Sequence, residues 1–198
     1  MRPVAVATVA LASVLLAGPA AAHVGIGATS GFWHGVWHPV GGPDHVLAMV
    51  AVGMIAAGIG GRALWLVPAA FVAVMAVGGL LGSGGLALPF VNGTVTMSVL
   101  VFGITLAARL PIPAALAAVL VGTFALFHGH AHGTEMSAGT SGATYGLGFL
   151  VATAALHGLG LAAGLATLRL RPRLADGVMR FTGVATALAG AALLVASQ

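Results

Sequence analysis

The sequence contains no cysteine and very few charged residues. Without thiols, neither a disulfide framework nor a thiolate metal site can form, so any bound metal must use nitrogen, oxygen or thioether sulfur. Charged residues make up 5% of the 198 residues and hydrophobic residues make up 60%, with a mean hydropathy of +1.12. This composition has too little polar surface for a soluble domain and predicts an all-α membrane protein.

The positive charge comes from arginines that lie between apolar stretches. The formal net charge is +4, but the arginines do not form a basic patch, so nucleic acid is not expected as a partner. No glycine-rich motif is followed by the Lys-Ser/Thr pair of a phosphate-binding loop. The partner predicted by this composition is the lipid bilayer.

Residues 1–22 have the organisation of a secretory signal peptide. Arg2 precedes an apolar stretch, and Pro19 is followed by three alanines of the kind that signal peptidase accepts. Cleavage after Ala22 would make His23 the first residue of the mature protein. The alternative is an uncleaved first helix. We expect residues 23–198 to form a single transmembrane domain.

Six apolar stretches are long enough to cross a hydrocarbon core of about 30 Å. They cover residues 38–60, 63–81, 90–108, 112–132, 143–168 and 177–196. If the mature N-terminus is outside, the inner connections are 60–62, 109–113 and 169–177. They hold Arg62, Arg109, Arg169, Arg171 and Arg173, and Arg180 lies just inside the next helix. The positive-inside rule therefore predicts a multi-pass protein of the bacterial inner membrane with both termini in the periplasm.

The first stretch opens with a cluster of ionisable residues. His38 and His45 are seven residues apart, which on a continuous helix places them on the same side, with His34 extending the stripe and Asp44 about 100° away. Pro39 and Pro43 are expected to distort this end of the helix.

The fourth stretch ends with a second cluster. Helical spacing places His128, His132 and Glu135 on one stripe and directs His130 away from it. His157 lies about midway along the fifth stretch, where it is either a metal ligand or a residue that hydrogen-bonds across helices.

Charges in a membrane span cost at least about 2.5–3.5 kcal/mol each, so these residues predict a functional site. Imidazoles combined with carboxylates suit a divalent first-row ion such as nickel, cobalt, zinc or copper. Asp44 and Glu135 would balance its charge. The predicted metal ligands are His23, His38, Asp44, His45, His128, His132, Glu135 and His157.

These residues resemble the HupE/UreJ family of hydrogenase and urease accessory proteins, which are small nickel permeases. The resemblance rests on His38-Pro-Val-Gly-Gly-Pro-Asp44-His45 with the following Val-Leu-Ala-Met49, on Pro68-Ala-Ala-Phe71, and on Ala131-His132-Gly-Thr-Glu135. It extends over essentially the whole chain. It implies nickel uptake into the cytoplasm for hydrogenase or urease maturation, with cytoplasmic nickel chaperones of these enzymes as partners.

The resemblance also implies roles for particular residues. His38, Asp44, His45, His132 and Glu135 would be the functional positions, and Phe71 would support them.

One position departs from the family pattern. Where the family usually has a glutamate at the start of the third span, this chain has Asn92. An amide oxygen attracts a divalent ion less than a carboxylate does, so the substrate could be another metal or the affinity lower. The alternative interpretation is that Asn92 caps the helix of that span.

Two other functions remain as alternatives to transport. A membrane protein that stores or delivers copper would use His23, whose α-amine and imidazole can chelate Cu(II). A b-type haem protein would use two histidines from facing helices, although haem does not require nearby acids. We expect no enzymatic activity, because Ser141 lies in a glycine-rich loop without a nucleophile elbow.

Overall fold

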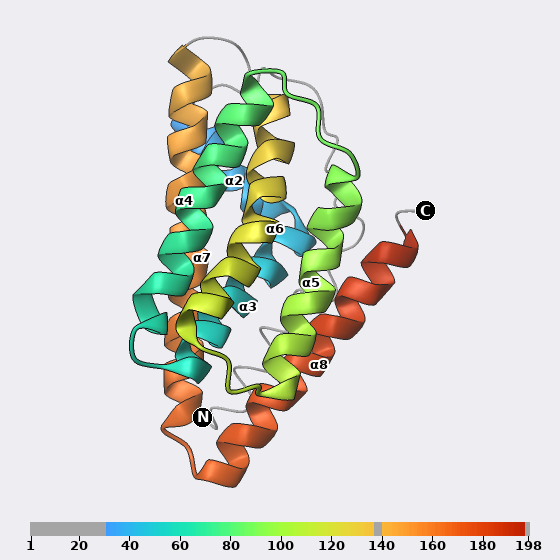
Figure 1. Cartoon of the computed structure of the whole chain (residues 1–198). Coiled ribbons are helices and arrows are strands. Elements are labelled where there is room, and N and C mark those ends of the chain that lie inside the picture. The colour runs from blue at the N-terminus through green and yellow to red at the C-terminus, as the bar shows by residue number, and fades with distance from the viewer. Residues whose placement is uncertain (1–30, 137–139, 197–198) are drawn as a thin grey trace.

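The computed structural model describes residues 31–136 and 140–196, and every regular element in these residues is a helix. The helices run in the order α2 (Phe32–Gly41), α3 (Pro43–Ile59), α4 (Ala63–Ser83), α5 (Val91–Ala108), α6 (Ala114–Glu135), α7 (Thr140–Leu168) and α8 (Pro172–Ala196). Figure 1 shows them as one bundle of long helices. The predicted signal peptide, its cleavage site and His23 lie outside the described residues.

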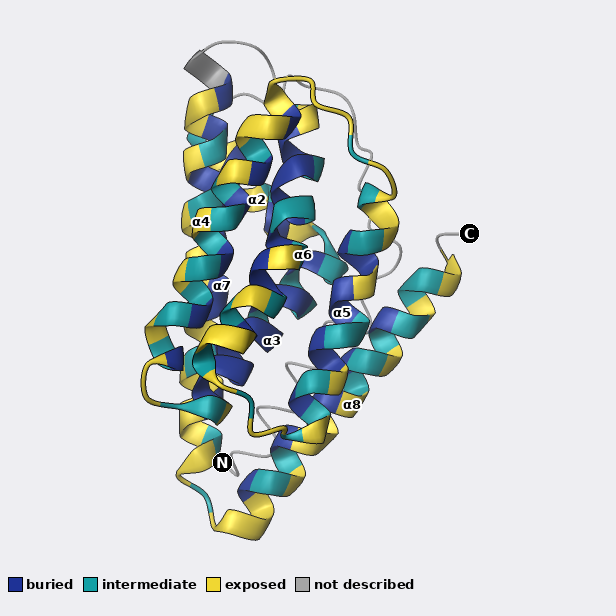
Figure 2. Cartoon of the chain, in the orientation of Figure 1, coloured by how far each residue is buried: buried dark blue, intermediate teal, exposed yellow. Residues whose placement is uncertain are grey.

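Five of the helices, α4 to α8, are each long and apolar enough to cross a membrane, and the pair α2 and α3 counts as a sixth span if taken together. Their outward faces carry large apolar side chains that a soluble protein would bury, among them Leu80, Leu116, Leu159 and Leu188. Figure 2 shows that exposed residues follow the outside of the bundle along its whole length. The chain is a multi-pass membrane protein, and these faces meet lipid.

The first span is broken into two helices, which goes beyond the distortion that Pro39 and Pro43 predicted. Helices α2 and α3 meet at an angle of 88°. Gly42 joins them with an extended backbone, φ −98° and ψ 114°, and it precedes Pro43. Proline disfavours helical dihedrals in the residue before it, so the helix ends there and starts again at Pro43.

Glycines allow the helices to approach each other at backbone distance. A Cβ atom on Gly129 of α6 would overlap the carbonyl oxygen of Met75 in α4, and one on Gly133 would overlap that of Gly79. Gly103 and Gly183 bring α5 and α8 together in the same way. Such contacts hold helices together in lipid, where no hydrophobic force drives their association.

The same device joins α7 to α2 and α3. A Cβ on Gly35 of α2 would overlap the carbonyl oxygen of Tyr145, and one on Gly148 would overlap that of Phe32. Deeper in the bundle, Gly160 packs against the backbone of Val50 in α3. Helix α7 therefore holds both halves of the bent pair in place.

The two ends of the bundle differ in chemistry. The α3–α4, α5–α6 and α7–α8 connections lie at one end (Figure 1). These connections carry Arg62, Arg109, Arg169 and Arg171, and Arg173 follows directly. We refer to this as the arginine end. The opposite end, where α6 finishes and α7 begins, is the histidine end.

Candidate metal centre

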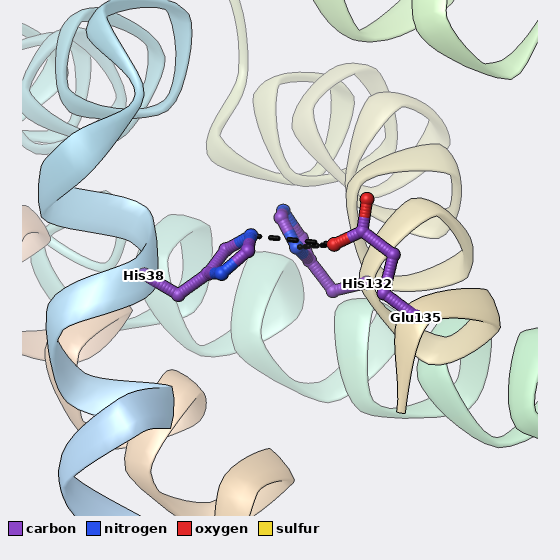
Figure 3. Close-up of side chains that lie close together, drawn as sticks. All are labelled: His38, His132 and Glu135. Atoms are coloured by element: carbon purple, nitrogen blue, oxygen red, sulfur yellow. Dashed lines mark ion pairs between the residues drawn. The ribbon is translucent and has the colours of Figure 1, made fainter. Parts of the chain in front are cut away.

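Three side chains at the histidine end offer their donor atoms to one point. His38 comes from α2, and His132 and Glu135 come from the last turn of α6. One donor atom from each lies within 4.8 Å of the others. The His38 Nε2 atom is 3.3 Å from Glu135 Oε2, and His132 Nδ1 is 3.6 Å from the same oxygen (Figure 3).

The polar group continues from His132 into the bundle. His132 Nε2 lies 2.6 Å from His45 Nε2, and His45 Nδ1 lies 2.9 Å from Asp44 Oδ1. Asp44 also accepts a hydrogen bond from the backbone N–H of His45 at 2.9 Å. One connected set of side chains therefore runs from Asp44 through His45 and His132 to Glu135 and His38. The Asp44 carboxylate lies at one end of the set, and the Glu135 carboxylate lies beside His38 at the other.

This geometry determines the tautomers of the two central imidazoles when both are neutral. A carboxylate only accepts, so His45 carries its proton on Nδ1 and donates it to Asp44. Its Nε2 atom must then accept from His132, which carries its proton on Nε2. The lone pair of His132 Nδ1 therefore faces the carboxylate of Glu135.

A lone pair directed at a carboxylate is unfavourable unless a cation lies between them. Two imidazole nitrogens and one carboxylate oxygen, supported by a second carboxylate behind His45, form the donor set that first-row divalent ions prefer. Glu135 and His38 are partly open to the surface, whereas His132 is buried. The arrangement suits an ion that enters from the histidine end.

Aromatic residues enclose the buried side of this group. The Phe149 ring lies 4.2 Å from that of His132, and the Tyr145 ring lies 5.7 Å from that of His38. Both side chains come from α7 and are buried. We had not predicted these two residues as part of the site, although their i, i+4 spacing places them on one face of the helix.

We refer to His38, His132 and Glu135 as the three-donor group. The remaining histidines of α6 lie apart from it. His128 Nε2 hydrogen-bonds Ser98 Oγ of α5 at 2.9 Å, and its ring lies 4.8 Å from that of His45. His130 is directed away, as predicted, and its Nε2 donates to the backbone carbonyl of Leu86 at 2.6 Å. Ser98 was not singled out in the sequence, although it is a polar residue in an apolar span.

Three expectations about the first cluster were wrong in their geometry. His38 and His45 converge because the helix breaks between them, and not because they share one face. His34 does not extend the group and is exposed on α2. Asp44 does not lie aside, since its carboxylate contacts the His45 ring.

Two interpretations of polar residues in other spans were also wrong. Asn92 does not cap α5, because Phe90 precedes that helix in a left-handed conformation, φ 58°, and no side chain makes a cap hydrogen bond there. His157 is buried in α7, but its ring makes no hydrogen bond across helices in the described part of the chain.

Comparisons with known proteins show the family of the chain. The family model described as HupE / UreJ protein matches residues 10–193. Protein HupE of Rhizobium leguminosarum bv. viciae is 49% identical over 188 residues, which cover 95% of this chain and 96% of the relative. No solved structure matches the chain. The chain belongs to the HupE/UreJ family of hydrogenase and urease accessory proteins.

Proposed function

We propose that the protein is a permease that carries a divalent transition metal, with nickel as its main substrate, through the bacterial inner membrane into the cytoplasm. The observation that carries the proposal is the three-donor group of His38, His132 and Glu135, whose donor atoms lie within 4.8 Å of one another. Among the other predicted ligands that the structure describes, Asp44 and His45 lie behind this group, and His128 and His157 lie further into the bundle.

The orientation follows from charge. If the arginine end is cytoplasmic, as the positive-inside rule requires, the histidine end faces the periplasm and receives ions from there. Both termini are then periplasmic. The membrane potential favours inward movement of a doubly charged ion by about 4.6 kcal/mol at 100 mV. Capture by cytoplasmic nickel chaperones of hydrogenase or urease would add to this force.

The alternatives of copper storage and haem binding receive less support. The Nε2 atoms of His45 and His132 are 2.6 Å apart, which leaves no space for an iron atom ligated by both. The chelate expected at His23 for copper storage lies outside the described residues. A storage protein would bind metal without moving it, so transport separates the two functions.

The test is uptake of radioactive nickel by proteoliposomes that contain the full chain. His38→Ala, His132→Ala and Glu135→Gln should each lower uptake at least about tenfold, because each removes one donor from the ion. His130→Ala is the matched control, since it removes a buried imidazole from the same helix without touching the three-donor group. Wild-type protein that binds nickel but transports none would overturn the proposal and favour storage.

A further inference from the structure

His157 is a buried imidazole without a hydrogen-bond partner. It lies in α7 with an exposed fraction of 1%, and neither ring nitrogen meets a partner in the described part of the chain. An unsatisfied buried polar group costs about 1–3 kcal/mol, so such groups are rare in folded proteins. A side chain that only packs would be more stable as a phenylalanine.

The position of His157 along α7 is well beyond the three-donor group. It follows Tyr145, which contacts His38, by twelve residues, or about 18 Å at 1.5 Å per residue. This distance is more than half of a hydrocarbon core of about 30 Å. An ion at His157 would therefore have passed the middle of the hydrocarbon core.

A continuous series of buried rings leads to His157 from the site. The His132 ring lies 4.6 Å from the His45 ring, which lies 4.8 Å from that of His128. The Phe71 ring follows, 5.5 Å from His128 and 4.9 Å from His157. Phe71 is fully buried and separates the last two imidazoles.

Two weaker donors lie one helical turn above His157. Thr153 of α7 is fully buried on the same face, and its hydroxyl contacts the sulfur of Met75 at 3.8 Å. Met75 is one turn from Phe71 on α4, so a hydroxyl and a thioether lie beside the ring that separates His128 from His157. A soft or borderline divalent ion can use both kinds of donor.

We infer that His157 is an inner binding position for the transported ion, which reaches it from His128 by passing Phe71. The inference rests on the proposed transport function and adds a second binding step to it. One imidazole with a hydroxyl and a thioether nearby binds an ion more weakly than the three-donor group does. Weak binding suits this position, because an ion held too tightly could not leave toward the cytoplasm.

The test compares His157→Phe with the wild-type protein in two measurements. Phenylalanine keeps a ring against Phe71 and removes both nitrogens. Nickel uptake by proteoliposomes should fall at least about tenfold in maximal rate, whereas nickel affinity of the purified protein should stay within about twofold, because the three-donor group is intact. His157→Gln, which returns one carbonyl donor, should recover part of the rate.

The outcomes are distinguishable. Wild-type uptake by His157→Phe would overturn the inner position while leaving transport in place. A loss of nickel affinity as large as that of His38→Ala would also overturn it, since His157 would then contribute to binding at the three-donor group. If the wild-type protein itself transports no nickel, the proposed function fails and the inner position fails with it. If His157→Phe does not fold, His157→Gln replaces it in both measurements. Its uptake should lie below the wild-type rate, and wild-type uptake or a loss of nickel affinity as large as that of His38→Ala would overturn the inner position.

Discussion

The Nε2 atoms of His45 and His132 lie 2.6 Å apart, so the two imidazoles form a direct hydrogen bond between α3 and α6. Asp44 gives this bond its direction by accepting a hydrogen bond from the Nδ1–H of His45. Asp44 bonds to His45, and His45 bonds to His132. Through these two hydrogen bonds, Asp44 determines which ring nitrogen of His132 is left free for a metal ion. We therefore expect Asp44 to act as an orienting residue for the proposed metal site.

Asp44→Asn should weaken nickel binding by about 10–100-fold. The substitution preserves the size of the side chain and removes its charge. An amide can donate as well as accept, so His45 and His132 lose their fixed tautomers. Isothermal titration of the purified protein measures the change. Asp176→Asn is the control, because it removes the same charge from the arginine end, where Asp176 pairs with Arg109 and Arg180. Equal affinities for both variants would contradict the orienting role.

Metal selectivity should follow the donor set of the three-donor group. Cobalt, copper and zinc should compete with nickel for binding, whereas magnesium in large excess should not, because it prefers oxygen ligands and gives up its water reluctantly. Displacement of radioactive nickel from the purified protein by each ion checks this. Effective competition by magnesium would mean that the imidazoles do not contribute ligands.

Asn92→Glu should raise nickel uptake at low nickel concentration. Asn92 is exposed in the first turn of α5, so a carboxylate there would attract cations and also interact favourably with the helix N-terminus. The gain should shrink at high ionic strength, because an exposed charge is screened over about 8 Å at physiological salt.

Asn92→Gln separates charge from side-chain length in this measurement. It has the length of glutamate without its charge, so its uptake should match the wild-type protein at every salt concentration. An equal gain for both variants would show that the carboxylate is not responsible.

Gly129→Ala should destabilise the protein by about 1–3 kcal/mol, because the new Cβ would force α6 away from the backbone of α4. Gly158→Ala is the matched control in α7, where a Cβ meets nothing within 4 Å and alanine favours the helix. Thermal unfolding in detergent compares the two. Equal melting temperatures would show that α4 and α6 can separate without cost.

The hydrophobic pattern was sufficient to predict the class of fold and the helical segments, because a helix that meets lipid must be apolar along its length. It also predicted that the arginines gather at one end. A distortion at Pro39 and Pro43 was predicted, but the full break at Gly42, with its 88° bend, was not, so the helical spacing of His38 and His45 does not hold across it. A periodicity argument holds only while the helix continues.

The site residues could be predicted from their cost in a membrane, and their contacts could not. Histidines and acids stand out in an apolar chain, which is why His38, His132 and Glu135 were found. Tyr145 and Phe149 did not stand out, because aromatic residues are ordinary in apolar helices. Which imidazole touches which depends on helix packing, and the glycine contacts that set this packing are determined by pairs of helices distant in sequence.

The backbone contacts at Gly129 and Gly35 limit how the residues of the three-donor group can move relative to one another. Gly129 binds α6 to α4, and Gly35 binds α2 to α7. The predicted ligands His132 and Glu135 belong to the first of these pairs, and the predicted ligand His38 belongs to the second. A small rigid displacement between the pairs would change the separation of His38 from Glu135, now 3.3 Å, while His132 and Glu135 would stay together. Two ligands would then stay with the ion as the third departs, so the coordination number could fall without the unwinding of any helix.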